Sequence, residues 1–259
     1  MIVCKIVILI VIAINFIHKI YPHFHNGGQM WMKVTLMCGR FALKTDPTTL
    51  AQQFELSQIP AVTARYNIAP TQAILAVRQS EQGRIGDLLE WGLIPAWAKD
   101  PRIASNLINA RSETVAEKPS FRTALRQRRC LIIADGFYEW QASGGKRKQP
   151  MFFHMRDGKP FAMAGLWETW RDPSGSERRT CTILTTSPNE LLASVHDRMP
   201  VILARDDYAR WLDLGLRHAE ALSDLFAPFP AEAMAAYPVG LGVNRVGNDS
   251  PACMEPLPA

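Results

Sequence analysis

Apolar residues from about residue 73 onward gather in short runs separated by turn residues. Short runs rich in β-branched, aliphatic and aromatic residues are typical of β-strands. Residues 130–134 are apolar almost without interruption, which is typical of a strand buried on both faces. The pattern predicts strands over residues 73–77, 85–91, 130–134, 137–140, 151–155, 160–170 and 180–186.

Helices are predicted where a capping residue precedes a mixed stretch. Asp46 and Pro47 fit the N-cap and first position of a short helix. Ser187 and Glu190 fit a capping box for a helix that ends at His196. Further helical segments are predicted over residues 121–129, 204–214 and 218–226, and after residue 114. This mixture predicts an α+β fold, a single compact domain around a strongly bent, mainly antiparallel sheet with flanking helices.

The first 36 residues differ from the rest. Residues 6–14 are all apolar, but this run is shorter than the roughly 20 residues that span a membrane. It resembles a signal-peptide core, yet no small-residue cleavage site follows. The segment is an artefact of an upstream start codon, a removable leader or a membrane anchor. We favour the first, because the composition changes sharply at Met37, and expect the folded domain to span residues 37–256.

Composition adds two constraints. The chain of 259 residues has a net charge of +5, but residues 1–36 supply three lysines and no acid, so the remainder carries only +2. Overall charge therefore does not argue for nucleic-acid binding, and any such site must be a local patch. The five cysteines are odd in number and widely spaced, which argues against a disulfide framework or a zinc site and favours a reducing, cytoplasmic compartment.

The pair Met37-Cys38 is typical of the N-terminus of a protein. Removal of Met37 would leave Cys38 with a free α-amine beside its thiol. The amine can form a Schiff base with an aldehyde, and the thiol can then close a five-membered thiazolidine ring. Both groups ordinarily titrate near neutral pH, at about 8.5 for a thiol and about 7.7–8.0 for an α-amine. Arg40, two residues on, is expected to lower the pKa of the thiol.

Three further polar residues are candidates for chemistry. Glu139 lies among aromatic residues, so it is either a desolvated general acid or a carboxylate at a solvated strand edge. His196 at a helix end is either a proton-transfer group or a structural histidine. Asn109 could orient a substrate oxygen or the Cys38 amine. The basic segment 121–129 is either a solvated helix face or a phosphate contact, and both alternatives stay open.

Five motifs together resemble the SRAP family, the SOS response-associated peptidases or abasic site processing proteins. The resemblance covers about residues 37–256. In family order, the motifs are Cys38-Gly39-Arg40-Phe41, Tyr66-Asn67-Ile68-Ala69-Pro70, Asn109-Ala110-Arg111-x-Glu113-Thr114, Asp135-Gly136-Phe137-Tyr138-Glu139-Trp140 and His196-Asp197-Arg198-Met199-Pro200.

The resemblance implies that an N-terminal cysteine crosslinks to the aldehyde of an abasic site in single-stranded DNA. The resulting thiazolidine would shield the lesion during the DNA damage response, without a metal or other cofactor. Members normally begin at the Met-Cys pair, and some are thought to remove a short leader themselves. The implied site consists of Cys38, Asn109, Glu139 and His196 for catalysis, Arg40 and Arg111 for phosphate, and Asn67, Pro70 and Trp97 for the DNA channel.

Two alternatives remain open from the sequence. The first is a thiol peptidase or amidohydrolase that uses Cys38 and His196. The second is a non-catalytic binder of single-stranded DNA. A membrane-anchored protein would require the first 36 residues to be an anchor, which their length disfavours. We expect a monomer whose partner is single-stranded DNA containing abasic sites.

Overall fold

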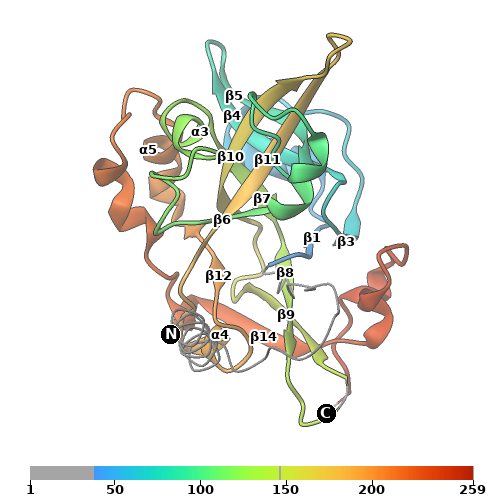
Figure 1. Ribbon diagram of the computed structural model, residues 1–259. Helices are drawn as coiled ribbons and strands as arrows, with labels where there is room; N and C mark the ends of the chain where they lie inside the picture. Colours follow the sequence, from blue (N-terminus) through green and yellow to red (C-terminus); the bar gives the residue numbers. More distant parts are fainter. Residues whose placement is uncertain (1–37, 146, 259) are drawn as a thin grey trace, which may run out of the picture. The chain divides into compact units, whose positions relative to one another are not determined.

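The computed structural model describes residues 38–145 and 147–258. The predicted N-terminal extension, residues 1–36, and Met37 lie outside the described residues. Two sheets contain the strands, and in Figure 1 most of the first lies below the second. The first sheet has the strand order β14 (Met234–Pro238), β9 (Gln149–Met155), β8 (Gly136–Gln141), β1 (Phe41–Leu43) and β3 (Arg65–Ile68).

The second sheet curls until it closes on itself. Its order is β12 (Met199–Pro200), β11 (Glu177–Thr186), β10 (Phe161–Arg171), β7 (Arg129–Ala134), β4 (Ala73–Ser80), β5 (Gly83–Trp91) and β2 (Leu56–Gln58), with β13 (Ile202–Leu203) on β10 and β6 (Asn109–Arg111) on β11. Strand β5 also pairs in parallel with β11, so β11, β10, β7, β4 and β5 form a closed ring. Most other pairings are antiparallel. The predicted α+β fold around a strongly bent sheet is confirmed.

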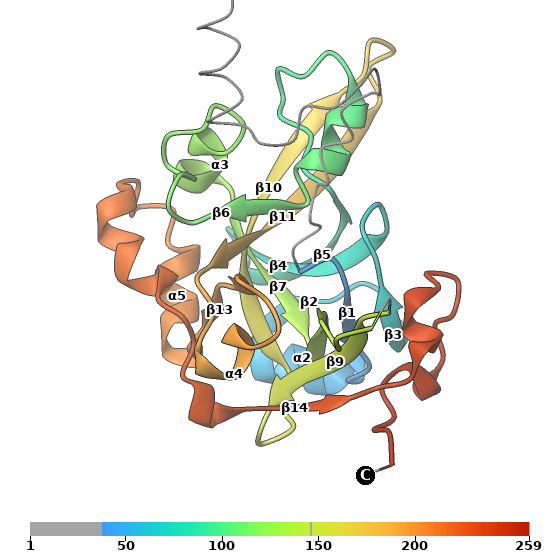
Figure 2. The same cartoon turned by 60° about the horizontal axis from the view of Figure 1, so that its bottom comes forward.

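Short helices connect and flank the strands (Figure 2). The α-helices are α2 (Pro47–Phe54), α3 (Arg122–Gln127), α4 (Glu190–Ala193) and α5 (Tyr208–Leu212). The 3₁₀ segments are η1 (Pro101–Asn106), η2 (Arg205–Asp207), η3 (Ala219–Phe226), η4 (Ala231–Ala233), η5 (Leu241–Asn244) and η6 (Pro251–Cys253). No helix in the described ranges has the length and apolar character needed to cross a membrane.

The structure confirms one of the predicted helix starts and corrects other predicted helices. Asp46 caps α2 as predicted, since its side chain accepts from the N–H of Thr49. The predicted capping box at Ser187 is wrong, because Asn189 is the N-cap of α4 and its side chain accepts from the N–H of Leu192. The helix is also a single turn, Glu190–Ala193. The predicted helix over 204–214 divides into η2 and α5, the one over 218–226 is the 3₁₀ segment η3, and the stretch from residue 114 has turns.

The strands of the first sheet pack closely at Gly136, the first residue of β8. A Cβ at this position would lie 2.2 Å from Cζ of Phe152 and 2.5 Å from the carbonyl oxygen of Phe153. Only a glycine fits there without displacement, because real Cβ atoms do not approach so closely. Since β8 pairs with both β1 and β9, this contact sets the place of Glu139 farther along β8.

Candidate active site

Cys38 and Glu139 meet across the β1–β8 pair. Phe41 lies opposite Phe137, so the antiparallel register carries Cys38, just before β1, towards Glu139 on β8. The backbone N–H of Cys38 donates to Oε1 of Glu139 at 2.7 Å. Both residues are buried, at 3% and 2% exposure. The backbone nitrogen of Cys38 is therefore hydrogen-bonded to a carboxylate that is shielded from water.

Burial changes the acidity of both groups. It raises the pKa of Glu139 above its ordinary value of 4.5, although nearby His196 and the Cys38 N–H favour the ionised form. It also raises the pKa of the Cys38 thiol well above 9.0, and the charge of Glu139 raises it further. The cation that partly offsets this increase is Arg198. The expectation that Arg40 produces a low thiol pKa is therefore wrong.

Cys38 has an unusual backbone conformation. Its φ is 44°, in the left-handed region that non-glycine residues rarely adopt. Glu55 and Thr71 are the other non-glycine residues with positive φ in the described ranges. Glu55 ends α2 as its C-cap, where left-handed conformations are common. Cys38 has no such helix-end explanation, so the surrounding structure holds it in this conformation.

His196 follows α4 by three residues, and its N–H donates to the carbonyl of Leu192 at 2.9 Å. Its Nδ1 lies 3.1 Å from the backbone nitrogen of Arg198 and 3.1 Å from Oδ1 of Asp197. An N–H can only donate, so contact with Arg198 requires a neutral imidazole to carry its proton on Nε2. The charge of His196 favours the ionised form of Glu139 and so partly opposes the rise in the pKa of Glu139. Cys38 and Glu139 thus share one buried site, and His196 acts on the acid electrostatically.

Arg198 and Glu113 join this region, and sequence reasoning did not select either as a site residue. The Arg198 guanidinium donates to both carboxylate oxygens of Glu113, at 2.5 and 2.8 Å. It also donates to the carbonyl of Thr185 on β11, at 2.6 Å. Both residues lie inside motifs that resemble the SRAP family. The signal that could have found them is their opposite charge next to candidate site residues.

Asn109 and Arg111 share one face of β6, because Ala110 between them is buried. The register places Asn109 opposite Ile183 and Arg111 opposite Thr185 on β11. Asn109 is half-buried and Arg111 is exposed. Arg198 reaches the same β11 residue that Arg111 faces, so β6 adjoins the Arg198 region. A contact of Asn109 with the Cys38 amine stays a prediction.

Arg40 and Asn67 form a second polar cluster. Nη1 of Arg40 donates to Oδ1 of Asn67 and to the carbonyl of Val243, both at 2.6 Å. Asn67 is fully buried, and its amide donates to the carbonyls of Val243, Arg245 and Asn248 at 3.1, 3.0 and 2.7 Å. These bonds hold the loop of residues 243–248 against β3. DNA contacts by Arg40 and Asn67 stay predictions.

Trp97 and Pro70 lie on loops. Trp97 is 59% exposed, which makes it the most exposed large apolar side chain of the described residues. Its loop is fixed by two bonds to Ala98, whose N–H donates to Pro95 at 2.8 Å and whose carbonyl accepts from Nε1 of Trp170 at 2.7 Å. Pro70 is half-buried and precedes Thr71, whose φ is 73°. Trp97 is thus an exposed ring on a fixed loop.

The basic segment 121–129 divides into two parts. Arg122 and Arg126 lie exposed on α3, where both alternatives remain open. Arg129 is 1% exposed at the start of β7, so it is neither on a solvated face nor at a phosphate contact. Its guanidinium donates to the carbonyls of Trp211, Leu125 and Asp213. A buried cation is stabilised here by backbone carbonyls near the ends of α3 and α5.

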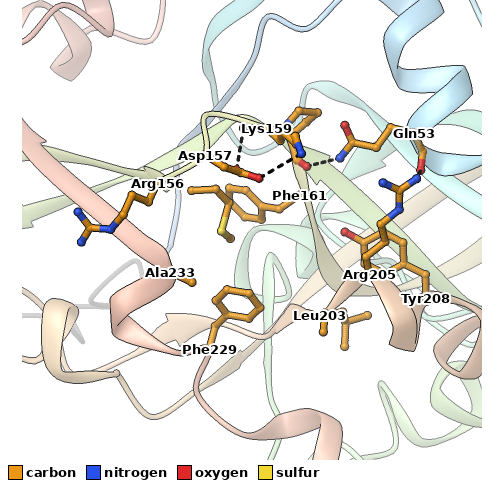
Figure 3. A pocket seen from close by; sticks show the side chains of 13 residues that line it. Gln53, Arg156, Asp157, Lys159, Phe161, Leu203, Arg205, Tyr208, Phe229 and Ala233 are labelled. Carbon is orange, nitrogen blue, oxygen red and sulfur yellow. Dashed lines mark hydrogen bonds and ion pairs between the residues drawn. The ribbon is translucent and has the colours of Figure 1, made fainter.

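Other potential sites lie away from Cys38. A cavity of about 540 Å³ has an apolar floor that includes Phe161, Leu203 and Phe229, with Lys159 and Arg205 among its basic lining residues (Figure 3). None of the predicted site residues lines it.

The described part of the chain holds no group of three or more His, Cys, Asp and Glu residues arranged to bind a metal ion. Its four cysteines are free and buried.

Comparisons with known proteins add an independent line of evidence. The family model described as SOS response associated peptidase (SRAP) matches residues 37–246. "Abasic site processing protein YoqW" of Bacillus subtilis (strain 168) is 44% identical over 223 residues, which cover 85% of this chain and 99% of the relative. "Abasic site processing protein YedK" of Escherichia coli (strain K12) is 31% identical over 229 residues, covering 85% and 100%. A crystal structure from Bacteroides thetaiotaomicron matches with a TM-score of 0.77 and 27% identity, over 85% of this chain and all of that one.

Proposed function

The chain belongs to the SOS response-associated peptidase family, and on this premise we propose that it processes abasic sites in DNA through Cys38. The similarity to relatives named abasic site processing proteins supports this function. The observation that carries the finer proposal is the 2.7 Å contact between the backbone nitrogen of Cys38 and buried Glu139. If Cys38 is the first residue, this nitrogen is a free amine held beside a proton-transfer group.

The reaction joins Cys38 to the ring-opened aldehyde of the abasic sugar. The amine adds to the aldehyde carbon, and loss of one water gives an imine. The thiol then adds across the C=N bond, so that sulfur bonds to carbon and the thiol proton passes to nitrogen. The product is a thiazolidine, and neither an oxidant nor a reductant is needed. An abasic site has no base to unstack, which lowers the cost of exposing it.

The neighbouring residues would move protons and orient the reactants. The raised pKa of Glu139 suits a group that protonates the sugar ring oxygen during ring opening and later accepts a proton. His196, with its Nε2 proton, would carry protons in imine formation and in its reversal. Asn109 would orient the amine or the sugar oxygen. Arg40 and Arg111 would contact phosphates, with Asn67 and Pro70 shaping the channel and Trp97 stacking on a base.

This chemistry requires Cys38 to be residue one of the active protein. While Met37 is attached, the nitrogen of Cys38 is an amide, and no imine can form on it. We propose that residues 37–256 form the working domain and that residues 1–36 come from a mis-assigned start or are removed, with self-removal as one route. The family match beginning at residue 37 supports this boundary. The protein would work in the cytoplasm, as a monomer on single-stranded DNA.

A mechanism that uses only the thiol has less support. A cysteine peptidase attacks with a thiolate, and burial raises the pKa of Cys38 well above 9.0. The thiazolidine route places less demand on the thiol, because it attacks an activated imine carbon within the same residue. The two mechanisms also differ in the group they need. Chemical blocking of the α-amine abolishes thiazolidine formation but leaves thiol acylation possible.

The test is the intact mass of the purified protein before and after exposure to single-stranded DNA containing an abasic site. We expect a chain that begins at Cys38 and a heat-stable adduct whose mass is protein plus DNA minus one water. Cys38→Ser and Cys38→Ala both keep a free α-amine, so each should form only an imine, trapped by borohydride, and no heat-stable thiazolidine. An adduct of the same kind on a chain that retains Met37 would overturn the mechanism, as would the absence of any adduct on a chain that begins at Cys38.

A further inference from the structure

The candidate site contains an ion pair that joins two strands to β11. Glu113 follows β6 by two residues, and Arg198 directly precedes β12. Both strands pair with the end of β11, where Thr185 lies opposite Arg111 of β6 and Pro200 of β12. The Thr185 carbonyl accepts from the N–H of Ser112 at 2.9 Å and from Arg198 at 2.6 Å. Glu113 and Thr185 together fix the Arg198 guanidinium at this junction.

The pair is asymmetric in exposure. The side chain of Arg198 is 12% exposed, whereas that of Glu113 is 51% exposed. Two parallel N–H···O bonds between a guanidinium and a carboxylate fix orientation as well as distance. Such a pair on a half-exposed carboxylate adds little to global stability. Its geometric effect on the Arg198 main chain is therefore more important than its effect on folding.

The Arg198 main chain acts directly on His196. Nδ1 of His196 lies 3.1 Å from two groups that require opposite tautomers. The Arg198 N–H is a donor, so it requires an unprotonated Nδ1 and leaves the proton on Nε2. The Asp197 carboxylate is an acceptor, so it requires a proton on Nδ1. Asp197 is 85% exposed and hydrated, which weakens its competition while Arg198 stays in place.

We propose that Glu113 is a positioning residue for His196: it anchors Arg198, whose N–H keeps the imidazole in the Nε2–H tautomer. This inference rests on the proposed function for its consequence, because His196 then carries on Nε2 the proton that it would transfer in imine formation. Loss of Glu113 frees the Arg198 side chain, loosens its main chain and lets Asp197 take a proton on Nδ1. Glu113 would thus act through Arg198, to which both its carboxylate oxygens are bonded.

The first measurement is the tautomer of His196, read from ¹⁵N chemical shifts of the ring in the full-length protein at a pH where the imidazole is neutral. We expect Nε2–H in the unmodified protein and a shift towards Nδ1–H in Glu113→Gln. Glu117→Gln is the matched control, since Glu117 is exposed in the same loop and its side chain has no ion pair among the described residues. An unchanged tautomer in Glu113→Gln overturns the proposal, whether or not the protein crosslinks DNA.

The second measurement is the single-turnover rate of crosslinking to abasic single-stranded DNA. We expect Glu113→Gln to react about tenfold more slowly, as when an outer residue that orients an imidazole is removed. The double variant Glu113→Gln/Asp197→Asn should recover most of the rate and the Nε2–H tautomer, because the Asn amide can donate to Nδ1. Failure of this rescue with an intact fold would show that Glu113 acts otherwise. Absence of crosslinking in the unmodified, correctly processed protein would instead refute the proposed function and leave the tautomer result standing.

Discussion

Replacement of Glu139 by Gln should make the protein more stable at neutral pH while it impairs the proposed chemistry. The folded-state pKa of Glu139 is raised above its ordinary value of 4.5 because the carboxyl is buried. The stability contribution of such a group is fully present below pH 4.5 and is lost as pH rises through the folded pKa. Gln cannot ionise, so Glu139→Gln avoids this loss.

The magnitude follows from burial and from the bond to Cys38. Each unit by which the pKa is raised costs about 1.4 kcal/mol of stability at a pH above both values. Gln keeps an oxygen that can accept from the Cys38 N–H, so the 2.7 Å bond need not be lost. We expect Glu139→Gln to have a higher Tm than the unmodified protein at neutral pH, and the difference that is due to ionisation to vanish below pH 4.5.

Glu113→Gln is the matched comparison with the opposite sign. Hydrogen bonds from Arg198 hold the pKa of Glu113 below its ordinary value of 4.5. Its contribution is present above pH 4.5 and is lost as pH falls through the folded pKa. Because Glu113 is half-exposed, we expect Glu113→Gln to lower stability at neutral pH by less than about 1 kcal/mol. The difference from the unmodified protein should disappear in acid.

Thermal unfolding of the three proteins between about pH 2.5 and pH 8 tests this reasoning. The Tm difference between Glu139→Gln and the unmodified protein should grow as pH rises, and that of Glu113→Gln should shrink as pH falls. A constant difference for Glu139→Gln, or a loss of stability at neutral pH, would refute the assignment of a buried carboxylate with a raised pKa.

Three other changes have expected outcomes. Asn67→Ala removes the bonds that hold residues 243–248 and leaves buried carbonyls without a donor, so calorimetry should show a loss of about 2–4 kcal/mol; a change below 0.5 kcal/mol, as on a solvated surface, would contradict this. Trp97→Ala should weaken binding of single-stranded DNA by about 1–3 kcal/mol in a fluorescence titration, with Tm unchanged because the ring is 59% exposed. Gly136→Ala should destabilise the fold by about 1–3 kcal/mol in a urea unfolding experiment, since the new Cβ would clash with Phe152. Equal unfolding midpoints for this variant and the unmodified protein would show that β8 can shift freely.

The sequence was most informative where one segment determines its own structure. The long apolar runs became β4, β5, β7, β10 and β11, since burial of a whole strand leaves a visible pattern. Strands of three to five residues, such as β1, β6 and β14, have too few positions to show a period. The cap of α4 moved from Ser187 to Asn189 because both residue types cap helices well.

The site was predicted in part for a similar reason. Cys38, Glu139 and His196 each have a reactive group beside a recognisable motif, and in the structure the Cys38 nitrogen is bonded to Glu139 while His196 acts on that carboxylate electrostatically. The bond between Arg198 and Glu113 joins residues 85 positions apart, and no local pattern indicates it. The prediction that Arg129 lies on a solvated helix face or at a phosphate contact failed for the same reason. The Trp211 carbonyl that accepts from its Nε is 82 positions away in the sequence.

The positive φ of Cys38 has a consequence for the proposed removal of the preceding residues. This torsion is defined by the carbonyl carbon of the residue before Cys38, so it ceases to exist once Cys38 is the first residue. A left-handed φ costs a non-glycine residue roughly 1–2 kcal/mol. If the residues before Cys38 are removed as proposed, the cost of this left-handed φ disappears from the folded protein. The α-amine of that proposed product would rotate about its N–Cα bond and could keep the hydrogen bond that the Cys38 nitrogen makes to Glu139.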